Sequence, residues 1–193
     1  MKSSSTLLLA LALVLSSASC ASIGPASNAT QGRTTNANTG MTAADLGHRF
    51  LAMINSVNDF NALSAGFIQR STGQKFEGDE NSGFHTLKLP DGKWQYGTTY
   101  YFDRKLEEYS NVTLELIKAS NSVAETRLPC DLLLDEYDHS LKSMGFSVKP
   151  STHNEIGGLL ALHYTRKNMH VQIIPQHQAP TCIKAISVQK FEE

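Results

Sequence analysis

The stretch PCDLLLDEYDHSLKSMGF, residues 129–146, has the most regular pattern in the chain. Its apolar residues recur at steps of three and four, the spacing that gathers them on one side of an α-helix. They are Cys130, Leu133, Leu134, Tyr137, Leu141 and Met144. Gly145 is typical of the left-handed residue that ends a helix, and Phe146 is the apolar residue that often follows it. The pattern predicts one amphipathic helix over residues 129–146, with Cys130 at its N-terminus.

Before this helix, the chain predicts a first helix and then an antiparallel hairpin. Thr42 and Asp45 have the spacing of a capping box, and an apolar face follows them to a predicted end near Gly66. Residues 67–76 have a weak strand pattern. Residues 84–89 and 93–102 alternate around a Pro-Asp-Gly turn, and residues 112–116 form a further half-buried strand.

After the helix, strands are predicted at residues 146–149, 158–165, 169–175 and 181–191. Runs of strands after each helix predict an α+β fold and not a parallel α/β sheet. Gly66-Phe67 and Gly145-Phe146 mark a similar join in the two halves. We therefore predict two helix-plus-antiparallel-sheet units in tandem, residues 42–119 and 120–193, related by internal duplication and packed as one compact domain.

The first 20 residues have the layout of a secretory signal peptide: Lys2, an apolar run over residues 7–15, and then small residues. Ser17-Ala18-Ser19-Cys20 resembles the lipobox of bacterial lipoproteins. That resemblance implies that Cys20 becomes the lipidated first residue of the mature chain. The alternative is ordinary cleavage and secretion. Residues 21–41 are rich in Ser, Thr, Asn, Ala and Gly, which predicts a flexible tether.

Charge and motifs exclude several classes of function. The 17 basic and 18 acidic residues give a net charge of -1, so the chain has no electrostatic footprint for nucleic acid. It has no phosphate-binding glycine loop, zinc-protease helix motif, nucleophile-elbow serine or calcium loop. We therefore expect no cofactor and no dedicated metal site.

Three cysteines leave an even pair if Cys20 carries lipid. In an oxidising compartment, Cys130 and Cys182 then predict a disulfide, which would stabilise the fold by about 4 kcal/mol across its 52-residue separation. The alternative is a catalytic role for Cys130. Cys130-Asp131-Leu132 together with His170-Val171-Gln172-Ile173-Ile174 resembles papain-like cell-wall amidases, a resemblance that implies Cys130 as nucleophile and His170 as its base.

A two-residue turn at Lys167-Asn168 would pair Thr165 with His170, and His163 with Gln172. Because side chains alternate along a strand, these four polar side chains share one face, on which the two histidines are diagonal neighbours. This face and its tip predict a partner-binding surface made of His163, Thr165, Arg166, Lys167, His170 and Gln172. Two histidines could also bind zinc, but no position is fixed for a third ligand, His153 or His177.

These patterns predict an exported, lipid-anchored envelope protein, held in the periplasm at the outer membrane through Cys20. By elimination, we expect it to act by binding another envelope or exported protein, as a periplasmic inhibitor or immunity-type protein. A structural or assembly lipoprotein of the envelope is a second hypothesis. A cysteine hydrolase that uses Cys130 and His170 is the third.

Overall fold

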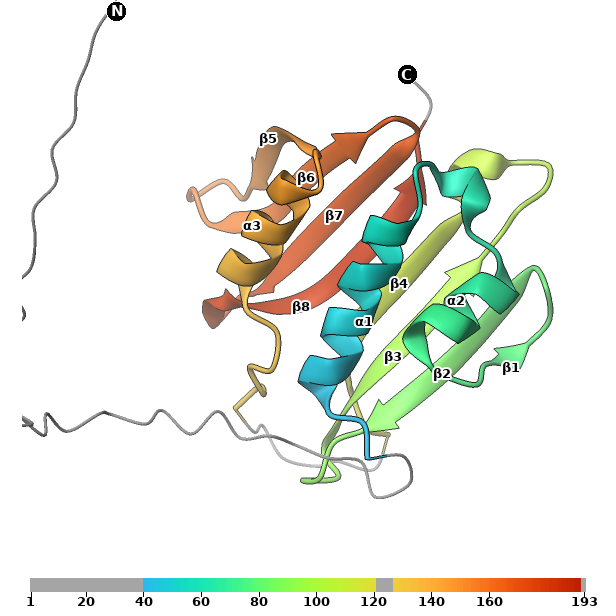
Figure 1. The fold of residues 1–193 in the computed structure, drawn as a ribbon. Coiled ribbons are helices and arrows are strands. Elements are labelled where there is room, and N and C mark those ends of the chain that lie inside the picture. The colour runs from blue at the N-terminus through green and yellow to red at the C-terminus, as the bar shows by residue number, and fades with distance from the viewer. Residues whose placement is uncertain (1–39, 121–126, 192–193) are drawn as a thin grey trace, which may run out of the picture.

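The computed structural model describes residues 40–120 and 127–191, so the predicted signal peptide, most of the tether and Cys20 lie outside the described residues. In those two ranges, eight strands form one antiparallel sheet in the order β1-β2-β3-β4-β8-β7-β6-β5. The three α-helices of the same ranges lie side by side over one face of the sheet (Figure 1). The predicted α+β class is confirmed. No helix of the described ranges is long and apolar enough to cross a membrane.

The helices are α1 Ala43–Ser56, α2 Ala65–Thr72 and α3 Leu134–Ser143, with short 3-10 turns η1 Phe60–Ala62 and η2 Glu107–Tyr109. The strands are β1 Glu77–Gly78, β2 Ser82–Lys88, β3 Trp94–Tyr101, β4 Asn111–Lys118, β5 Ser147–His153, β6 Leu159–Arg166, β7 Met169–Gln176 and β8 Ala179–Lys190. Each half of the chain contributes four consecutive strands. The last strands of the two halves, β4 and β8, pair at the centre of the sheet, with Leu114 opposite Ile186.

The first half departs from the prediction after its first helix. The capping box is confirmed, because Thr42 and Asp45 each accept a hydrogen bond from the other's backbone N–H. However, α1 ends at Ser56, and residues 67–72, predicted as a strand, belong to α2. The Ser64 side chain caps α2, and Gly73, with a φ of 70°, ends it. Gly66-Phe67 therefore lies inside a helix and is not the equivalent of Gly145-Phe146.

The second half confirms the position of α3 but shortens it. Helix α3 begins at Leu134, so Cys130 is not at a helix N-terminus. Leu133 instead forms a β-bridge with Cys182, and the Ile183 N–H donates to the Leu132 carbonyl at 2.9 Å. These contacts hold residues 130–133 in an extended path beside β8, which overrides their helical spacing. Gly145, with a φ of 83°, ends the helix as predicted.

The core lies between the helices and the sheet. The side chains that alternate strands direct toward the helices are buried, as the strand period of two requires. They include Tyr96, Thr98 and Tyr100 of β3, Val112, Leu114 and Leu116 of β4, Val171 and Ile173 of β7, and Ile186 and Val188 of β8. Tyr96 and Tyr100 of β3 are therefore part of this core. Helix α3 is fastened to the sheet by the buried Tyr164, whose hydroxyl donates to Asp138 at 2.8 Å.

Candidate functional site

The sheet face opposite the helices carries two rows of side chains that cross seven strands from β2 to β5. One row is Phe84, Thr99, Thr113, Ser187, Gln172, His163 and Lys149. The other is Ser82, Tyr101, Asn111, Gln189, His170, Thr165 and Ser147. None of these residues is buried. We call the two rows together the open face.

Most positions of the open face carry side chains without a full charge. Its single fully charged side chain is Lys149, at the β5 edge, and the remaining positions carry hydroxyl, amide, imidazole or aromatic groups. Phe84 and Tyr101, toward the other edge, are 50% and 44% exposed. At the centre, Thr113 donates to the Ser187 hydroxyl at 3.1 Å. The two rows therefore offer many hydrogen-bonding groups and two aromatic rings with one charge, while Glu115, on the same side of β4 as Thr113, pairs with Lys184 beside them.

His163 and His170 are in direct contact on this face, as the predicted hairpin register requires. His163 Nδ1 lies 3.1 Å from His170 Nε2, and the ring planes differ by 12°. The outer nitrogens are also bonded. His163 Nε2 lies 2.8 Å from the Thr152 hydroxyl, and His170 Nδ1 lies 3.3 Å from the Gln189 side-chain oxygen.

This chain of contacts fixes the neutral tautomers of both rings. Because the Gln189 oxygen only accepts, the proton of His170 lies on Nδ1 and its Nε2 is an acceptor. His163 must then donate from Nδ1, and its Nε2 accepts from Thr152. Burial and the neighbouring His170 lower the pKa of His163. The inner nitrogens therefore share one proton between them.

Arg166 was predicted as part of the partner-binding tip, but its guanidinium is engaged within the fold. Nη1 donates to the Met144 carbonyl at 2.8 Å, and Nη2 donates to the carbonyls of Val57 at 2.6 Å and Ile54 at 3.1 Å. The guanidinium carbon lies 4.4 Å from the centre of the Phe146 ring. Arg166 thus joins the C-terminal ends of α1 and α3, where a cation is favoured by the helix dipoles.

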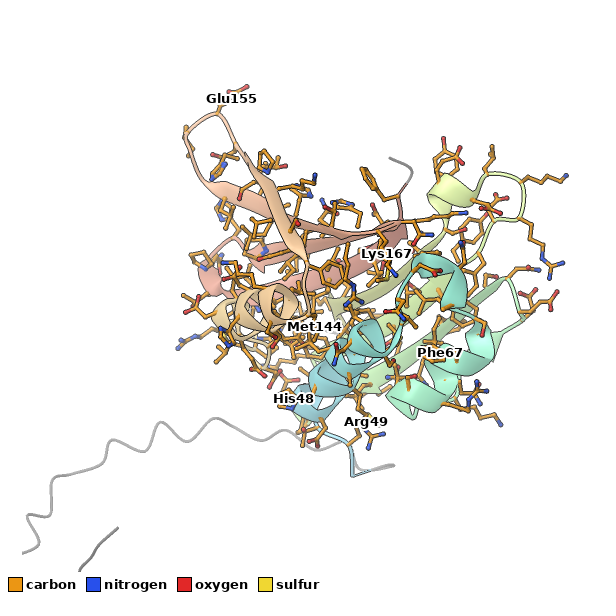
Figure 2. The ribbon with its side chains drawn as sticks, turned by 45° about the horizontal axis from the view of Figure 1, so that its top comes forward. His48, Arg49, Phe67, Met144, Glu155 and Lys167 are labelled. Carbon is orange, nitrogen blue, oxygen red and sulfur yellow. A yellow bond between two sulfur atoms is a disulfide. The ribbon has the colours of Figure 1, made fainter. Side chains whose placement is uncertain are left out.

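Lys167 and Asn168 form the two-residue turn between β6 and β7, as predicted. Lys167 is exposed, with a φ of 51°, and Figure 2 shows it at the end of the hairpin. The Asn168 side-chain oxygen accepts from the Phe60 N–H at 2.8 Å, which ties the turn to η1. Lys167 therefore lies at the margin of the open face and outside its two rows.

Cys130 and Cys182 form a disulfide that links the segment before α3 to the start of β8, as predicted. His170 pairs with Gln189 near the other end of β8. Gln189 lies seven residue steps along the strand from Cys182, a distance of about 23 Å at the usual strand rise. The alternative prediction of a Cys130–His170 catalytic pair is therefore wrong, since the thiol is bonded and the imidazole is remote.

The β5–β6 hairpin extends the sheet beyond the rest of the molecule, with Glu155 at its tip (Figure 2). The Asn154 side-chain oxygen accepts from the N–H groups of Ile156 at 3.2 Å and Gly158 at 2.6 Å, which closes the turn. Ile156 is 91% exposed. The hairpin therefore presents an apolar residue on an ordered turn at one end of the molecule.

Both edges of the sheet are poor templates for strand addition. At one edge, β1 is only two residues long. At the other, the pairing of β5 with β6 is irregular between Lys149 and His153, and Pro150 lies within that stretch. Short edge strands, bulges, Lys and Pro are the features that prevent edge-to-edge pairing. Contacts with a partner are therefore favoured on the faces and loops.

One hollow in the described part of the chain, of about 410 Å³, is lined by Phe60, Leu63 and Phe102 and by four charged residues. These are Asp103, Arg104, Glu107 and Lys190, of which Glu107 and Lys190 form an ion pair with each other. Within the described ranges, no three His, Cys, Asp or Glu side chains lie close enough to hold one metal ion.

Sequence reasoning identified the second-half portion of the open face and missed its continuation across the first half. Thr99, Tyr101, Asn111 and Thr113 alternate with buried residues, a signal that is visible in the sequence. What joins them to the histidines is the β4–β8 pairing, which no local pattern predicts. No protein-family model, curated protein or solved structure matches this chain.

Proposed function

We propose that this chain is an exported, lipid-anchored envelope protein that binds another protein through the open face. The observation that carries the proposal is the composition of its two rows, which hold one fully charged residue, Lys149, among hydroxyl, amide, imidazole and aromatic side chains. The core of a protein interface is depleted in charge and enriched in aromatic residues. Tyr, Ser and Asn side chains are likewise enriched in the antigen-binding loops of antibodies.

The preferred version is a periplasmic inhibitor or immunity-type protein that masks its partner. A broad, ordered face supports this version because a rigid surface loses little conformational entropy on binding. The ordered tip at Ile156 supplies a second contact beyond the end of the face. A structural or assembly lipoprotein would use the same surface, and the identity of the captured partner separates the two versions.

Site-specific photocrosslinking in native envelopes tests the proposal. A crosslinking amino acid at Gln172 is expected to give an adduct of defined mass with one partner. The matched control is Ala52, which is exposed on α1, on the opposite side of the molecule. Gln172→Lys, which places a charge within the face, should weaken the adduct at a crosslinker placed at Thr113 by tenfold or more. Equal adducts from positions 172 and 52, or none from either, would refute binding through the open face.

Lipidation and location are tested separately with Cys20→Ser. We expect the unaltered protein to partition into the detergent phase with the outer membrane and the variant to be released in soluble form. Equal partitioning of the two proteins would favour the secreted alternative. A change in location that leaves the position-172 adduct intact separates the anchor from the binding surface.

We also propose that the two halves are structural repeats. A twofold rotation about the Leu114–Ile186 pair exchanges β4 with β8 and, by the registers, places Thr98 of β3 on Ile173 of β7. Both residues are buried, as equivalent positions should be. An experimental structure should superpose the halves in this register. A one-residue offset would exchange the buried and open faces and would refute the repeat.

A further inference from the structure

The inner nitrogens of the two open-face histidines are separated by the distance that a shared metal ion requires. His163 Nδ1 and His170 Nε2 lie 3.1 Å apart. With bonds of about 2.0–2.1 Å, nitrogens at this separation subtend an angle of about 98° at an ion, between square-planar and tetrahedral values. Each metal–nitrogen bond would lie about 40° from the line that joins Nδ1 and Nε2, so both rings must turn to direct their lone pairs to one point, and the separation itself permits chelation.

The outer nitrogens have the partners that metal-binding histidines need. A histidine that binds a metal through one nitrogen usually donates from the other to an oxygen, which fixes the ring. Here the Thr152 hydroxyl lies 2.8 Å from His163 Nε2, and the Gln189 oxygen lies 3.3 Å from His170 Nδ1. Both oxygens can accept at once, and that arrangement leaves both inner nitrogens unprotonated.

We propose that His163 Nδ1 and His170 Nε2 bind one transition-metal ion of the Zn²⁺ or Cu²⁺ class on the open face. Imidazole nitrogen suits these ions, whereas Ca²⁺ and Mg²⁺ require oxygen ligands. The remaining coordination positions face solvent and take water or a donor from the bound partner. Apart from Gln189, which already contacts His170, the open face has an amide at Gln172, directly opposite His163.

When both histidines are neutral, metal binding requires the turn of each ring and a change of tautomer, but no net loss of a proton. In the free protein, His163 carries its proton on Nδ1 and donates it to His170. When the ion binds, that proton is lost from Nδ1 and one is gained at Nε2, so no net proton is released. The Thr152 hydroxyl changes from donor to acceptor, while His170 continues to donate from Nδ1 to Gln189.

Calorimetric titration of the full-length protein in detergent with ZnCl₂ or CuCl₂ tests the site. We expect one equivalent to bind, and His163→Gln and His170→Gln each to weaken the site by tenfold or more. His177→Gln, an exposed histidine outside the face, is the matched control and should leave the affinity unchanged. Lys149→Met should strengthen binding severalfold, because it removes a cation directly opposite His163. MgCl₂ should give no heat of binding.

Nitrogen-detected NMR of the imidazoles provides a second measurement on the unaltered protein, so the test does not depend on the folding of a variant. The metal-free spectrum should show Nδ1–H tautomers for both rings, and zinc should convert only His163 to the Nε2–H form. Absence of saturable binding, unchanged affinity in both histidine variants, or zinc-induced shifts confined to other histidines would overturn the proposal. The titration needs no protein partner, so its outcome is independent of the crosslinking result.

Discussion

Replacing Arg166 with Met tests whether this residue holds the two helices or contacts a partner. The substitution keeps a side chain of similar length over the Phe146 ring and removes all three hydrogen bonds from the guanidinium. The carbonyls of Ile54, Val57 and Met144 would lose the donors that Arg166 supplies at 2.6–3.1 Å. The C-terminal ends of α1 and α3 would then be joined only by packing.

The size of the effect follows from the number and type of these bonds. Hydrogen bonds with a charged partner contribute about 1.5–3 kcal/mol each, and water can replace some of them at helix ends. Burial lowers the pKa of Arg166, because folding removes part of the water around its guanidinium. That desolvation offsets part of the stabilisation from the three hydrogen bonds. We therefore expect Arg166→Met to lower the free energy of unfolding by about 3 kcal/mol, well below the sum of three full bonds.

Urea unfolding followed by circular dichroism measures this loss, which corresponds to a midpoint lower by about 1.5 M for a slope near 2 kcal/mol/M. Arg104→Met is the matched control, because Arg104 is exposed and pairs only with the exposed Glu80. Its effect should stay below about 0.5 kcal/mol. If the free energy of unfolding of Arg166→Met lies within about 1 kcal/mol of that of the unaltered protein, the substitution behaves like one at a surface contact, and the helix-joining role is refuted.

Three further substitutions follow from the structure. Cys130→Ser should lower the free energy of unfolding by about 4 kcal/mol in urea; an unaltered protein that keeps its midpoint under reducing conditions would contradict this. For Asp138, burial raises the pKa, but hydrogen bonds from Lys142 and Tyr164 outweigh it and lower the pKa overall. The ionised Asp138 therefore stabilises the fold at pH values above its pKa in the unfolded chain, and this stabilisation is lost as the pH falls through its pKa in the folded protein. The loss of unfolding free energy caused by Asp138→Asn, measured in urea, should accordingly become smaller between about pH 5 and 2. A loss that stays constant with pH would argue against this. Gly145→Ala should cost about 1 kcal/mol from its φ of 83° alone, since nothing lies within 4 Å of the added Cβ, and a neutral result in the same assay would exclude strain there.

Features set by neighbouring residues were predictable from the sequence. The capping box at Thr42, the Lys167-Asn168 turn and the contact between His163 and His170 all depend on residues within a few positions or within one hairpin. Their register follows from turn length and from the strand period of two. The disulfide was predictable for another reason, because the number of cysteines and the predicted export together leave few pairings.

Features set by distant contacts were not predictable in the same way. Residues 130–133 have helical spacing, but a β-bridge to Cys182 keeps them extended. Arg166 is the last residue of β6, next to a turn, where a cation normally contacts solvent. Its role is visible only once the C-terminal ends of the two helices are known to meet there. The wrong prediction of a strand at residues 67–76 had a local cause. Ser64 and Gly73 are ordinary helix-capping residues, and they could have identified α2 from the sequence.

The open face and the protected edges support the same mode of recognition. Strand addition depends on main-chain groups and tolerates many sequences, whereas a face selects its partner through side chains. Here β1 is too short and β5 too irregular to pair with a strand of a partner, so the main chain at the sheet edges offers few hydrogen bonds to one. A net charge of -1 also gives little long-range attraction to select a partner. In the partner binding that we propose, specificity would therefore come from the hydroxyl, amide, aromatic and imidazole groups on the two rows, with the histidine pair as the most distinctive chemical feature.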